Sequence, residues 1–468
     1  MKFSVSSLII AMTILFSFLT GSVIAENTTS SQWFEKGTLS IQNEEWEDAI
    51  AAFQHVIEED PENSEAYFKL GGSLLQNGNA SEAYDAYLTA TTLNPEYYEA
   101  YANIGFLRLF QVVPPDPSGA LEALEKAQPI FAEDSGVQIN YAIANLLQGN
   151  PDTAESTLVE LTQNEPDNVR AWYWLGITRA DNGNLEEGLE ALNKAVELYP
   201  EYKDAWYAKG DVEGNLGMQD ESLQSFEKLI SIPDEYSEPF QSVETGDANA
   251  HYRMGVIEYN LENDDKALEY FNKAIELNPD HHNAHYYLGI INFARDNLEE
   301  AEKELDAAVS VKDEFANAWY WKGRVNLRQM ETDQGVSDLQ KATSIDDQLT
   351  DAWYYLGGVL GDSGNYQEAV AAFEKVTDQR PEFADAFYFK GLDQYQLELI
   401  DEAKDSLEQA LQLNSSTFTP DLQANAWYLM GMVQTADDNI QEASRSFNES
   451  VALNASRSVA WNALGTAL

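Results

Sequence analysis

The chain repeats itself every 34 residues along most of its length. Tryptophans and prolines keep this step, as from Trp172 to Trp206 and from Pro61 to Pro95. Glycines keep it too, in an unbroken run at Gly255, Gly289, Gly323, Gly357 and Gly391. A fixed period of this length is typical of a repeat array, in which each unit buries its apolar surface only against its neighbours.

One unit, residues 169–200, indicates what each repeat folds into. Apolar side chains at helical spacing between Ala171 and Gly176 predict a first helix. The turn formers Asp-Asn-Gly-Asn at 181–184 end that helix, a second amphipathic segment follows, and Pro200 ends the second segment. Each repeat is therefore predicted to be a helix-turn-helix, and the small Gly176 leaves room for a neighbouring helix.

The repeat resembles the tetratricopeptide repeat (TPR) family. In the second repeat the matching residues are Tyr67, Leu70, Gly71, Ala83, Tyr87, Ala90 and Pro95. Counted in this phase, repeats begin at residues 30, 64, 98, 135, 169, 203, 248, 282, 316, 350, 384, 424 and 458. The resemblance implies an all-α fold, a right-handed α-solenoid of about twelve helix-turn-helix units plus a C-terminal half repeat.

Insertions interrupt the phase and suggest how the chain is divided. Residues 30–233 form repeats 1–6, residues 234–247 form an inserted loop, and residues 248–468 form repeats 7–12 and the half repeat. Shorter insertions fall near 113–117 and at 415–421. Loop insertions cost little chain entropy, so the long loop is either idle or a hinge between two arms.

Residues 1–25 have the composition of an export signal. Lys2 supplies a positive charge, Leu8 to Leu19 is almost wholly apolar, and Val23-Ile24-Ala25 has the small-residue pattern of a cleavage site. The alternative is an uncleaved anchor, because the uncharged stretch from Leu8 to Ala25 is just long enough to span a bilayer. Either way, the rest of the chain is expected outside the membrane, in an extracellular, periplasmic or cell-surface setting.

The charge of the chain excludes some partners. There are 80 acidic residues against 27 Lys plus Arg, a net charge of −53. Nucleic acid is not expected as a partner, because phosphate binding needs a basic surface. No membrane insertion is expected beyond the signal segment, and the absence of cysteine excludes disulfides and thiol chemistry.

No constellation in the sequence predicts catalysis, a metal or a cofactor. His281, His282 and His285 cluster, with His251 one repeat earlier. A zinc site needs at least three well-placed ligands. Because His251 and His285 occupy slots that hold tryptophan in other repeats, packing explains them without a metal. We expect neither a catalytic site, a metal site nor a cofactor.

The predicted inner surface carries the candidate binding residues. The TPR resemblance implies that positions 2, 5, 6 and 9 of each first helix face a concave groove. In repeats 8–11 these include Tyr286, Tyr320, Tyr354 and Tyr388 at position 5, Tyr287, Trp321, Tyr355 and Phe389 at position 6, and Asn283, Asn317, Asp351 and Asp385 at position 2. Tyr and Trp are typical of binding hot spots. The alternative is that these rings only pack between repeats.

Two functions remain open at this stage. The first is a non-catalytic scaffold that binds protein or peptide segments in the aromatic groove during assembly of an extracytoplasmic complex. The alternative is a glycan-binding accessory protein for cell-surface polymer assembly. An enzyme is not expected, because no segment outside the repeats reaches domain size. The half repeat at 458–468 is short and apolar, so we also expect this end to be either mobile or self-associating.

Overall fold

The computed structural model describes residues 29–111, 114–233, 246–413 and 415–467. Within them the chain forms twenty-five α-helices and one 3-10 helix, and no β-strand. The predicted signal segment at 1–25 and residues 234–245 of the predicted inserted loop lie outside the described residues. The all-α prediction is confirmed.

The chain divides into two compact units after Lys194. Unit 1 contains α1 (Ser30–Gln42), α2 (Trp46–Glu59), α3 (Ser64–Gln76), α4 (Ala80–Leu93), α5 (Tyr98–Phe110), α6 (Pro117–Lys126), the 3-10 helix η1 (Gln128–Glu133), α7 (Ser135–Leu147), α8 (Pro151–Asn164), α9 (Val169–Asp181) and most of α10 (Leu185–Leu198). The division falls within α10, whereas the predicted hinge at 234–247 stays a prediction.

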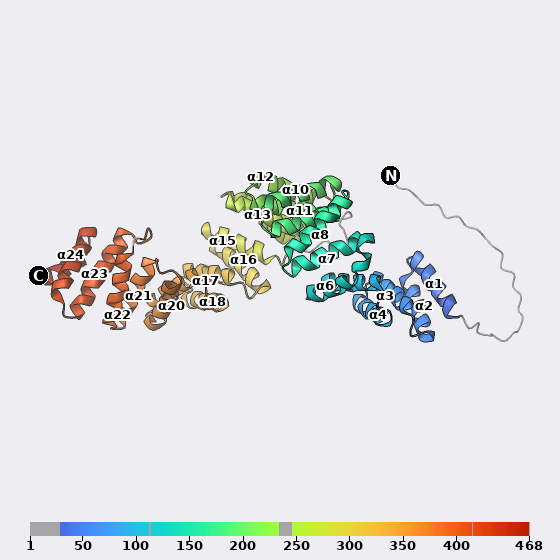
Figure 1. The fold of residues 1–468 in the computed structure, drawn as a ribbon. Helices are drawn as coiled ribbons and strands as arrows, with labels where there is room; N and C mark the ends of the chain where they lie inside the picture. The colour runs from blue at the N-terminus through green and yellow to red at the C-terminus, as the bar shows by residue number, and fades with distance from the viewer. Residues whose placement is uncertain (1–28, 112–113, 234–245, 414, 468) are drawn as a thin grey trace, which may run out of the picture. The chain divides into compact units, whose positions relative to one another are not determined.

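Unit 2 contains the remaining helices (Figure 1). They are α11 (Lys203–Asn215), α12 (Gln219–Ser231), α13 (Asp247–Asn260), α14 (Asp264–Leu277), α15 (His282–Ala294), α16 (Leu298–Val311), α17 (Ala316–Arg328), α18 (Thr332–Ile345), α19 (Thr350–Asp362), α20 (Tyr366–Gln379), α21 (Ala384–Gln396), α22 (Ile400–Gln412), α23 (Pro420–Ala436), α24 (Ile440–Leu453) and α25 (Ser458–Ala467).

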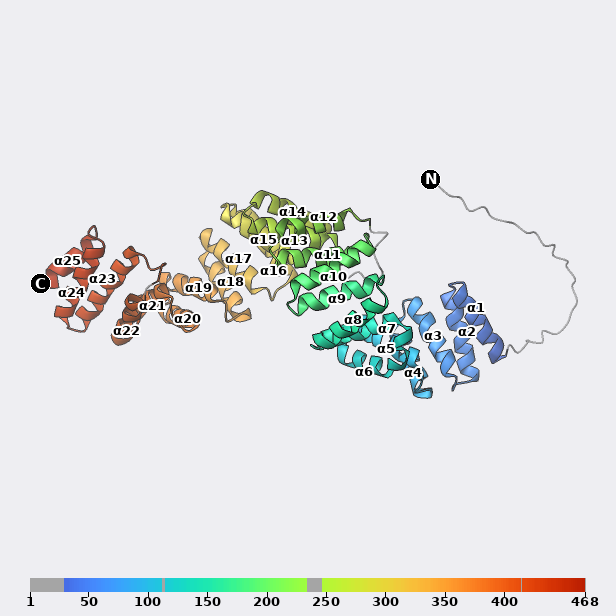
Figure 2. The ribbon, with the colours of Figure 1, turned by 45° about the horizontal axis from the view of Figure 1, so that its top comes forward.

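Each predicted repeat forms one pair of adjacent helices. The tightest contacts join an odd-numbered helix to the even-numbered helix that follows it, as in α13 with α14 and α23 with α24. Figure 2 shows these pairs in sequence, with α25 beside α24 as the half repeat. The helix-turn-helix prediction is therefore confirmed.

Two of the insertions have defined structures at their repeat boundaries. In the third repeat the second helix, α6, is short and is followed by η1. Before the twelfth repeat, Pro420 and Asp421 form the first turn of α23, and the Thr419 side chain caps it by accepting a hydrogen bond from the Leu422 amide. The extra residues thus lengthen a connection in one case and a helix in the other.

The repeated glycine makes room for the partner helix. A Cβ placed on Gly71 of α3 would lie 2.8 Å from Cε1 of Tyr87 in α4. At Gly289 of α15 it would lie 2.5 Å from Cγ of Leu305 in α16. Such distances are far below van der Waals contact, so only glycine lets the two helices approach this closely. This contact explains the 34-residue glycine ladder.

In five repeats a tryptophan, at 172, 206, 319, 353 or 461, ties the first helix to the chain before it. In these repeats the indole Nε1 donates a hydrogen bond to the carbonyl six residues earlier, at 2.9 Å from Trp172 to Pro166 and 2.8 Å from Trp319 to Asp313. His285 reproduces the contact, with Nε2 2.9 Å from the Pro279 carbonyl. The bond satisfies a carbonyl between helices, where backbone partners are lacking.

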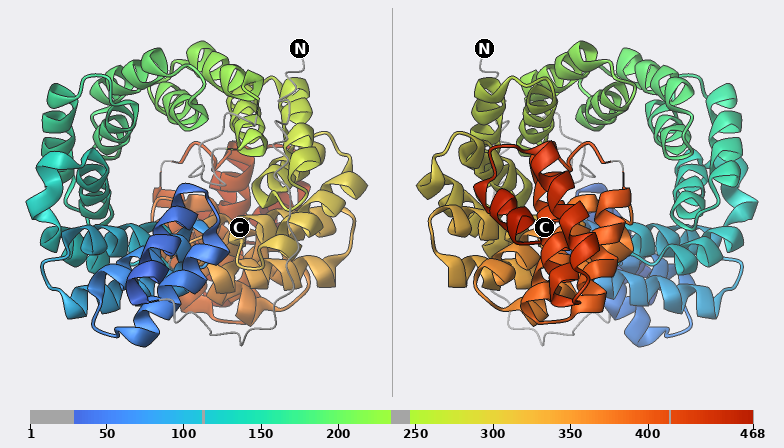
Figure 3. Two further views of the ribbon diagram at one scale, coloured as in Figure 1. Left: turned by 90° about the vertical axis from the view of Figure 1, so that its right-hand side faces the viewer. Right: turned by 90° about the vertical axis from the view of Figure 1, so that its left-hand side faces the viewer.

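First helices of successive repeats also contact one another within each unit. In unit 1, α1 contacts α3 and α5 contacts α7; in unit 2, α15 contacts α17 and α19 contacts α21. Figure 3 shows the pairs of unit 1, from blue to green, following one another around a curve. These contacts between first helices are closer than those between second helices of successive repeats.

Candidate functional site

Two of the predicted groove rings pack on the interior of unit 2. Tyr287 stacks on Phe271 with ring centroids 5.1 Å apart, and Phe389 stacks on Phe373 at 5.9 Å. Phe271 and Phe373 are fully buried in the second helices of the preceding repeats. These two position-6 rings therefore contribute to packing between repeats.

The other two position-6 rings surround a cation. The Arg324 guanidinium lies 4.4 Å from the Trp321 ring centroid and 4.6 Å from that of Tyr355. It also lies over Phe293 and Tyr320, and it donates a 3.3 Å hydrogen bond to the Tyr320 hydroxyl. Four rings stabilise the charge through their negative faces. No ion pair to Arg324 is found among the described residues.

The residue at position 24 of the preceding repeat separates these two arrangements. Where it is phenylalanine, as at Phe271 and Phe373, the position-6 ring stacks on it. Before Trp321 and Tyr355 the same position holds Leu305 and Leu339. Neither leucine offers a flat ring for stacking, and Trp321 and Tyr355 instead pack against the Arg324 guanidinium.

The position-5 tyrosines pack against the start of the next repeat. Tyr286 lies 4.9 Å from Phe315, and Tyr354 lies 5.0 Å from Phe383. Tyr320 and Tyr388 are buried. Burial is the largest cause that raises the pKa of Tyr354, to about 12. The phenols therefore stay protonated, and these tyrosines have a packing role in addition to any role in binding.

The polar position-2 residues are not gathered at one place. Asn317 and Asp351 are exposed, and Asp351 is paired with Arg380 at 3.0 Å. Asp385 is buried and accepts a 3.1 Å hydrogen bond from the Thr417 hydroxyl, while burial raises its pKa. Asn283 is half-buried. Both aspartates thus already have partners within the chain.

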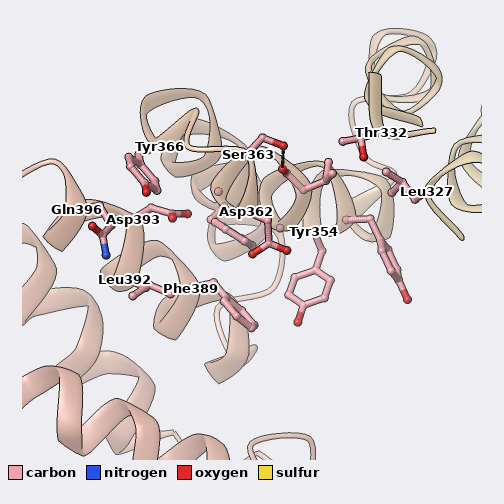
Figure 4. A pocket seen from close by; sticks show the side chains of 15 residues that line it. Leu327, Thr332, Tyr354, Asp362, Ser363, Tyr366, Phe389, Leu392, Asp393 and Gln396 are labelled. Atoms are coloured by element: carbon pink, nitrogen blue, oxygen red, sulfur yellow. Dashed lines mark hydrogen bonds between the residues drawn. The ribbon is translucent and has the colours of Figure 1, made fainter. Parts of the chain in front are cut away.

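A cavity of about 790 Å³ opens among α17 to α21 (Figure 4). Its aromatic lining includes Tyr354, Tyr355 and Phe389. Its polar lining includes Asp362 at the end of α19 and Asp393 and Gln396 on α21. Tyr355 is 37% exposed and is the most accessible of the predicted groove rings. The cavity combines an apolar wall with acidic and amide groups, which suits a ligand that carries both apolar and polar or cationic parts.

Asp393, like Asp362 and Gln396, lines this cavity and was not predicted from the sequence. Its side chain points from α21 toward α19, because a Cβ on Gly361 would lie 2.8 Å from its Oδ1. Asp393 is only 4% exposed. Burial, and then the charge of Asp362, raise its pKa to about 7.

The sequence did contain a signal for Asp393. It stands at position 10 of its repeat, where the other repeats have small or apolar residues. Those residues are Leu39, Ser73, Leu107, Ala144, Thr178, Val212, Ile257, Ile291, Val325, Val359, Val433 and Ala467. A comparison of the repeats position by position would have marked Asp393 as a carboxylate in a core slot.

The clustered histidines have partners inside the chain. His285 lies between two acceptors, with Nδ1 2.6 Å from Glu304 Oε2 and Nε2 near the Pro279 carbonyl. The Glu304 hydrogen bond is the largest cause that raises the pKa of His285. His281 contacts the Asn249 side chain and accepts from the Ala284 amide. No group of three or more potential metal ligands is found in the described part of the chain.

Over the residues that the structure describes, no helix has both the length and the apolar character needed to cross a bilayer.

Comparisons with known proteins identify the repeat. Models of the tetratricopeptide repeat match residues 34–98, 141–237, 248–303 and 354–416. A search of the curated proteins found no match.

Several solved structures resemble parts or most of the chain. YrrB, described as a TPR protein with an unusual peptide-binding site, is 20% identical with a TM-score of 0.39 over 42% of this chain and 98% of its own. PilW, described as a type IV pilus biogenesis factor, is 17% identical with a TM-score of 0.39 over 43% of this chain and 93% of its own. Yeast Tom70 is 14% identical with a TM-score of 0.36 over 94% of both chains.

The family models match repeats in both units and agree with the paired helices. The chain belongs to the tetratricopeptide repeat family.

Proposed function

We propose that the chain is a non-catalytic scaffold that binds a peptide segment of a partner protein on the first-helix side of unit 2. The observation that carries the proposal is the cavity of about 790 Å³ whose lining joins Tyr354, Tyr355 and Phe389 to acidic and amide side chains. Aromatic side chains with polar tips give large contact areas at low entropic cost, as in binding hot spots.

The proposed site is centred on Tyr355. Its ring is partly exposed, and the charged Arg324 guanidinium lies over the face of the ring. Tyr287 and Phe389, in contrast, are stacked on buried phenyl rings. We place Tyr286, Tyr287, Tyr320, Trp321 and Tyr388 at the flanks of the site, where they support its walls, together with Asn283, Asn317, Asp351 and Asp385.

An extended peptide suits the spacing of the first helices. Neighbouring helices are typically 8–10 Å apart, and an extended chain advances about 3.3 Å per residue. About three residues of the bound peptide would then span the distance from one first helix to the next. Contacts across α17, α19 and α21 would engage a segment of roughly six residues by this spacing.

The sequence supports an extracytoplasmic setting for the proposed complex. The apolar run in residues 1–25 supports export, and the net charge of −53 supports partners with basic segments.

Self-association through residues 458–468 is a further contact that we propose, because the Trp461 side chain on α25 is 50% exposed. Sedimentation should then show concentration-dependent oligomers that Trp461→Glu removes; a monomer at all concentrations would contradict this contact.

A selection experiment tests the peptide proposal. Random 12-residue peptides displayed on phage are selected on the immobilised full chain, and the affinities of selected peptides are measured by calorimetry. Tyr355→Ala should weaken binding by about 1–3 kcal/mol, the range for hot-spot truncation. Its melting temperature should stay within a few degrees of wild type because the ring is partly exposed.

Tyr287→Ala is the matched control. It should lower stability more than Tyr355→Ala, since it removes a ring stacked on the buried Phe271, and it should weaken binding less. If Tyr355→Ala unfolds the protein while the residual folded fraction binds normally, the ring belongs to the core and the proposed site is wrong.

A glycan remains the second candidate ligand. The exposed Tyr355 ring beside Asp362 and Gln396 offers a stacking face and hydrogen-bonding groups for sugar hydroxyls. A glycan array incubated with the full chain separates the two candidates. Glycan binding that Tyr355→Ala abolishes, with no peptide selected, would favour the sugar.

A further inference from the structure

Asp393 is a buried acid without a visible partner. Among the described residues, no hydrogen-bond donor and no cation contacts its carboxylate, although the residue is only 4% exposed. Burying a carboxylate without a partner is costly, and proteins usually pair such a group. The Asp393 carboxylate is therefore able to accept a hydrogen bond from a bound ligand or to pair with a cation of that ligand.

Other buried acids in this chain are paired. Their partners are Lys209 for Glu213, Lys266 for Glu258, His285 for Glu304, Asn326 for Asp338, and Thr417 for Asp385. The repeat architecture thus supplies a donor to a buried acid in several positions. Asp393 departs from that pattern, and its carboxylate faces a cavity.

The geometry around Asp393 keeps the carboxylate accessible from the cavity. Gly361 lies opposite it on α19, and any Cβ there would collide with the carboxylate oxygens. Asp362, the next residue, lines the same cavity and adds a second negative charge. Tyr354 and Phe389 supply apolar walls nearby. Together these groups form a site with negative charge at one wall and aromatic surface at another.

We propose that this cavity binds the side chain of a lysine or arginine from the partner peptide, with its cationic group against Asp393 and Asp362. This inference rests on the proposed peptide-binding function and names the chemistry of its ligand. The aliphatic stem packs on the aromatic walls, and the cation replaces the missing partner of Asp393. Arg324, held by Phe293, Tyr320, Trp321 and Tyr355, shows within the same chain that aromatic side chains of neighbouring first helices accept a guanidinium.

The bound cation removes the main cost of burying Asp393. In the free protein, a proton or water must neutralise or solvate the carboxylate. A lysine or arginine side chain offers a charge-assisted hydrogen bond instead, which is stronger than a neutral one. Recognition is therefore expected to discriminate against peptides that carry an apolar or acidic residue at this point.

The test compares peptide selections on variants of the full chain. Asp393→Asn keeps the shape of the side chain and removes its charge. Asp378→Asn is the matched control, because Asp378 is exposed on α20 and does not line the cavity. Wild type and Asp378→Asn should select peptides with lysine or arginine at one fixed position, and Asp393→Asn should select peptides without that preference.

Affinity measurements on one selected peptide complete the test. Asp393→Asn should weaken its binding by about 10- to 100-fold, the range for a hydrogen bond to a charged group. The same peptide with norleucine in place of its basic residue should bind wild type and Asp393→Asn equally. Asp393→Val, which restores the residue found in several repeats, should keep or raise the melting temperature while losing the preference for basic peptides.

The outcomes separate this inference from the proposed function. Selected peptides without a basic residue, or an equal preference in Asp393→Asn, would overturn the inference and leave peptide binding intact. Failure to select any peptide would overturn the proposed function itself. Calcium binding that depends on Asp393, measured by calorimetry with calcium chloride alone and accompanied by no preference for basic peptides, would show that the acids bind a metal cation instead.

Discussion

Gly71 and Gly72 are adjacent in α3, but a methyl group would meet different surroundings at the two positions. At Gly71 the added Cβ would lie 2.8–3.0 Å from three atoms of the Tyr87 ring, which is buried and fixed by its neighbours. At Gly72 the nearest atom is the Tyr87 hydroxyl oxygen at 3.6 Å, an ordinary contact. The two alanine variants therefore form a matched pair.

The difference between the variants isolates the steric cost. Replacing glycine by alanine inside a helix gains about 0.5–1 kcal/mol at either position. Adding a methyl group to a filled interior costs about 1–3 kcal/mol. Gly72→Ala should therefore stabilise the protein by about 0.5–1 kcal/mol, and Gly71→Ala should be less stable than Gly72→Ala by about 1–3 kcal/mol.

Amide hydrogen exchange is the suitable assay for this pair. Repeat arrays open locally, so a single global unfolding transition does not report on one repeat. The free energy of opening should fall in α3 and α4 of Gly71→Ala relative to Gly72→Ala, with little change in distant repeats. Equal protection in the two variants would refute the conclusion that close approach of α3 and α4 requires glycine at position 8.

Three further predictions concern other features of the repeats. Met330 has a φ of 67° in an exposed turn, so Met330→Gly should raise the free energy of unfolding by about 0.5–1 kcal/mol, measured by urea denaturation; an unchanged or lower stability would contradict a strained turn. Trp172→Phe removes the indole donor to the exposed Pro166 carbonyl and should cost about 0.5–1.5 kcal/mol, read as lower exchange protection at the start of α9; unchanged protection would contradict the role of this bond. The pKa of His285 is raised from 6.5 in the folded state by its bond to Glu304, so the stability that this pair adds is fully present below pH 6.5 and is lost as the pH rises through the folded pKa. The melting temperature of wild type minus that of His285→Gln should therefore decrease as the pH rises above 6.5. A difference that increases with pH would contradict this prediction.

The repeated features of the fold could be predicted from the sequence, because each recurs at a fixed step. Gly71 and Trp172 occupy slots whose contacts are local to one repeat and the next. The helix pairs and most of their boundaries follow from these slots. The start of α23 at Pro420 did not, because the extra residues before the twelfth repeat joined the helix in place of a loop.

The candidate site was less predictable because it depends on departures from the repeat. Whether a position-6 ring stacks or faces Arg324 follows from the residue at position 24 of the preceding repeat, as with Phe373 and Leu339. Because that residue lies on a second helix, the sequences of the first helices alone do not separate the four rings. Asp393 was passed over because one carboxylate among 80 acidic residues carries little information until its slot is compared across repeats.

Protection of backbone amides on ligand binding would locate the binding site within the chain. A peptide selected on the full chain is added at saturation, and hydrogen exchange is followed across both units. Exchange should become slower in α19 near Tyr354–Asp362 and in α21 near Phe389–Gln396, with no comparable change in unit 1. Protection confined to unit 1, or to the second helices of unit 2, would contradict a binding site in this cavity.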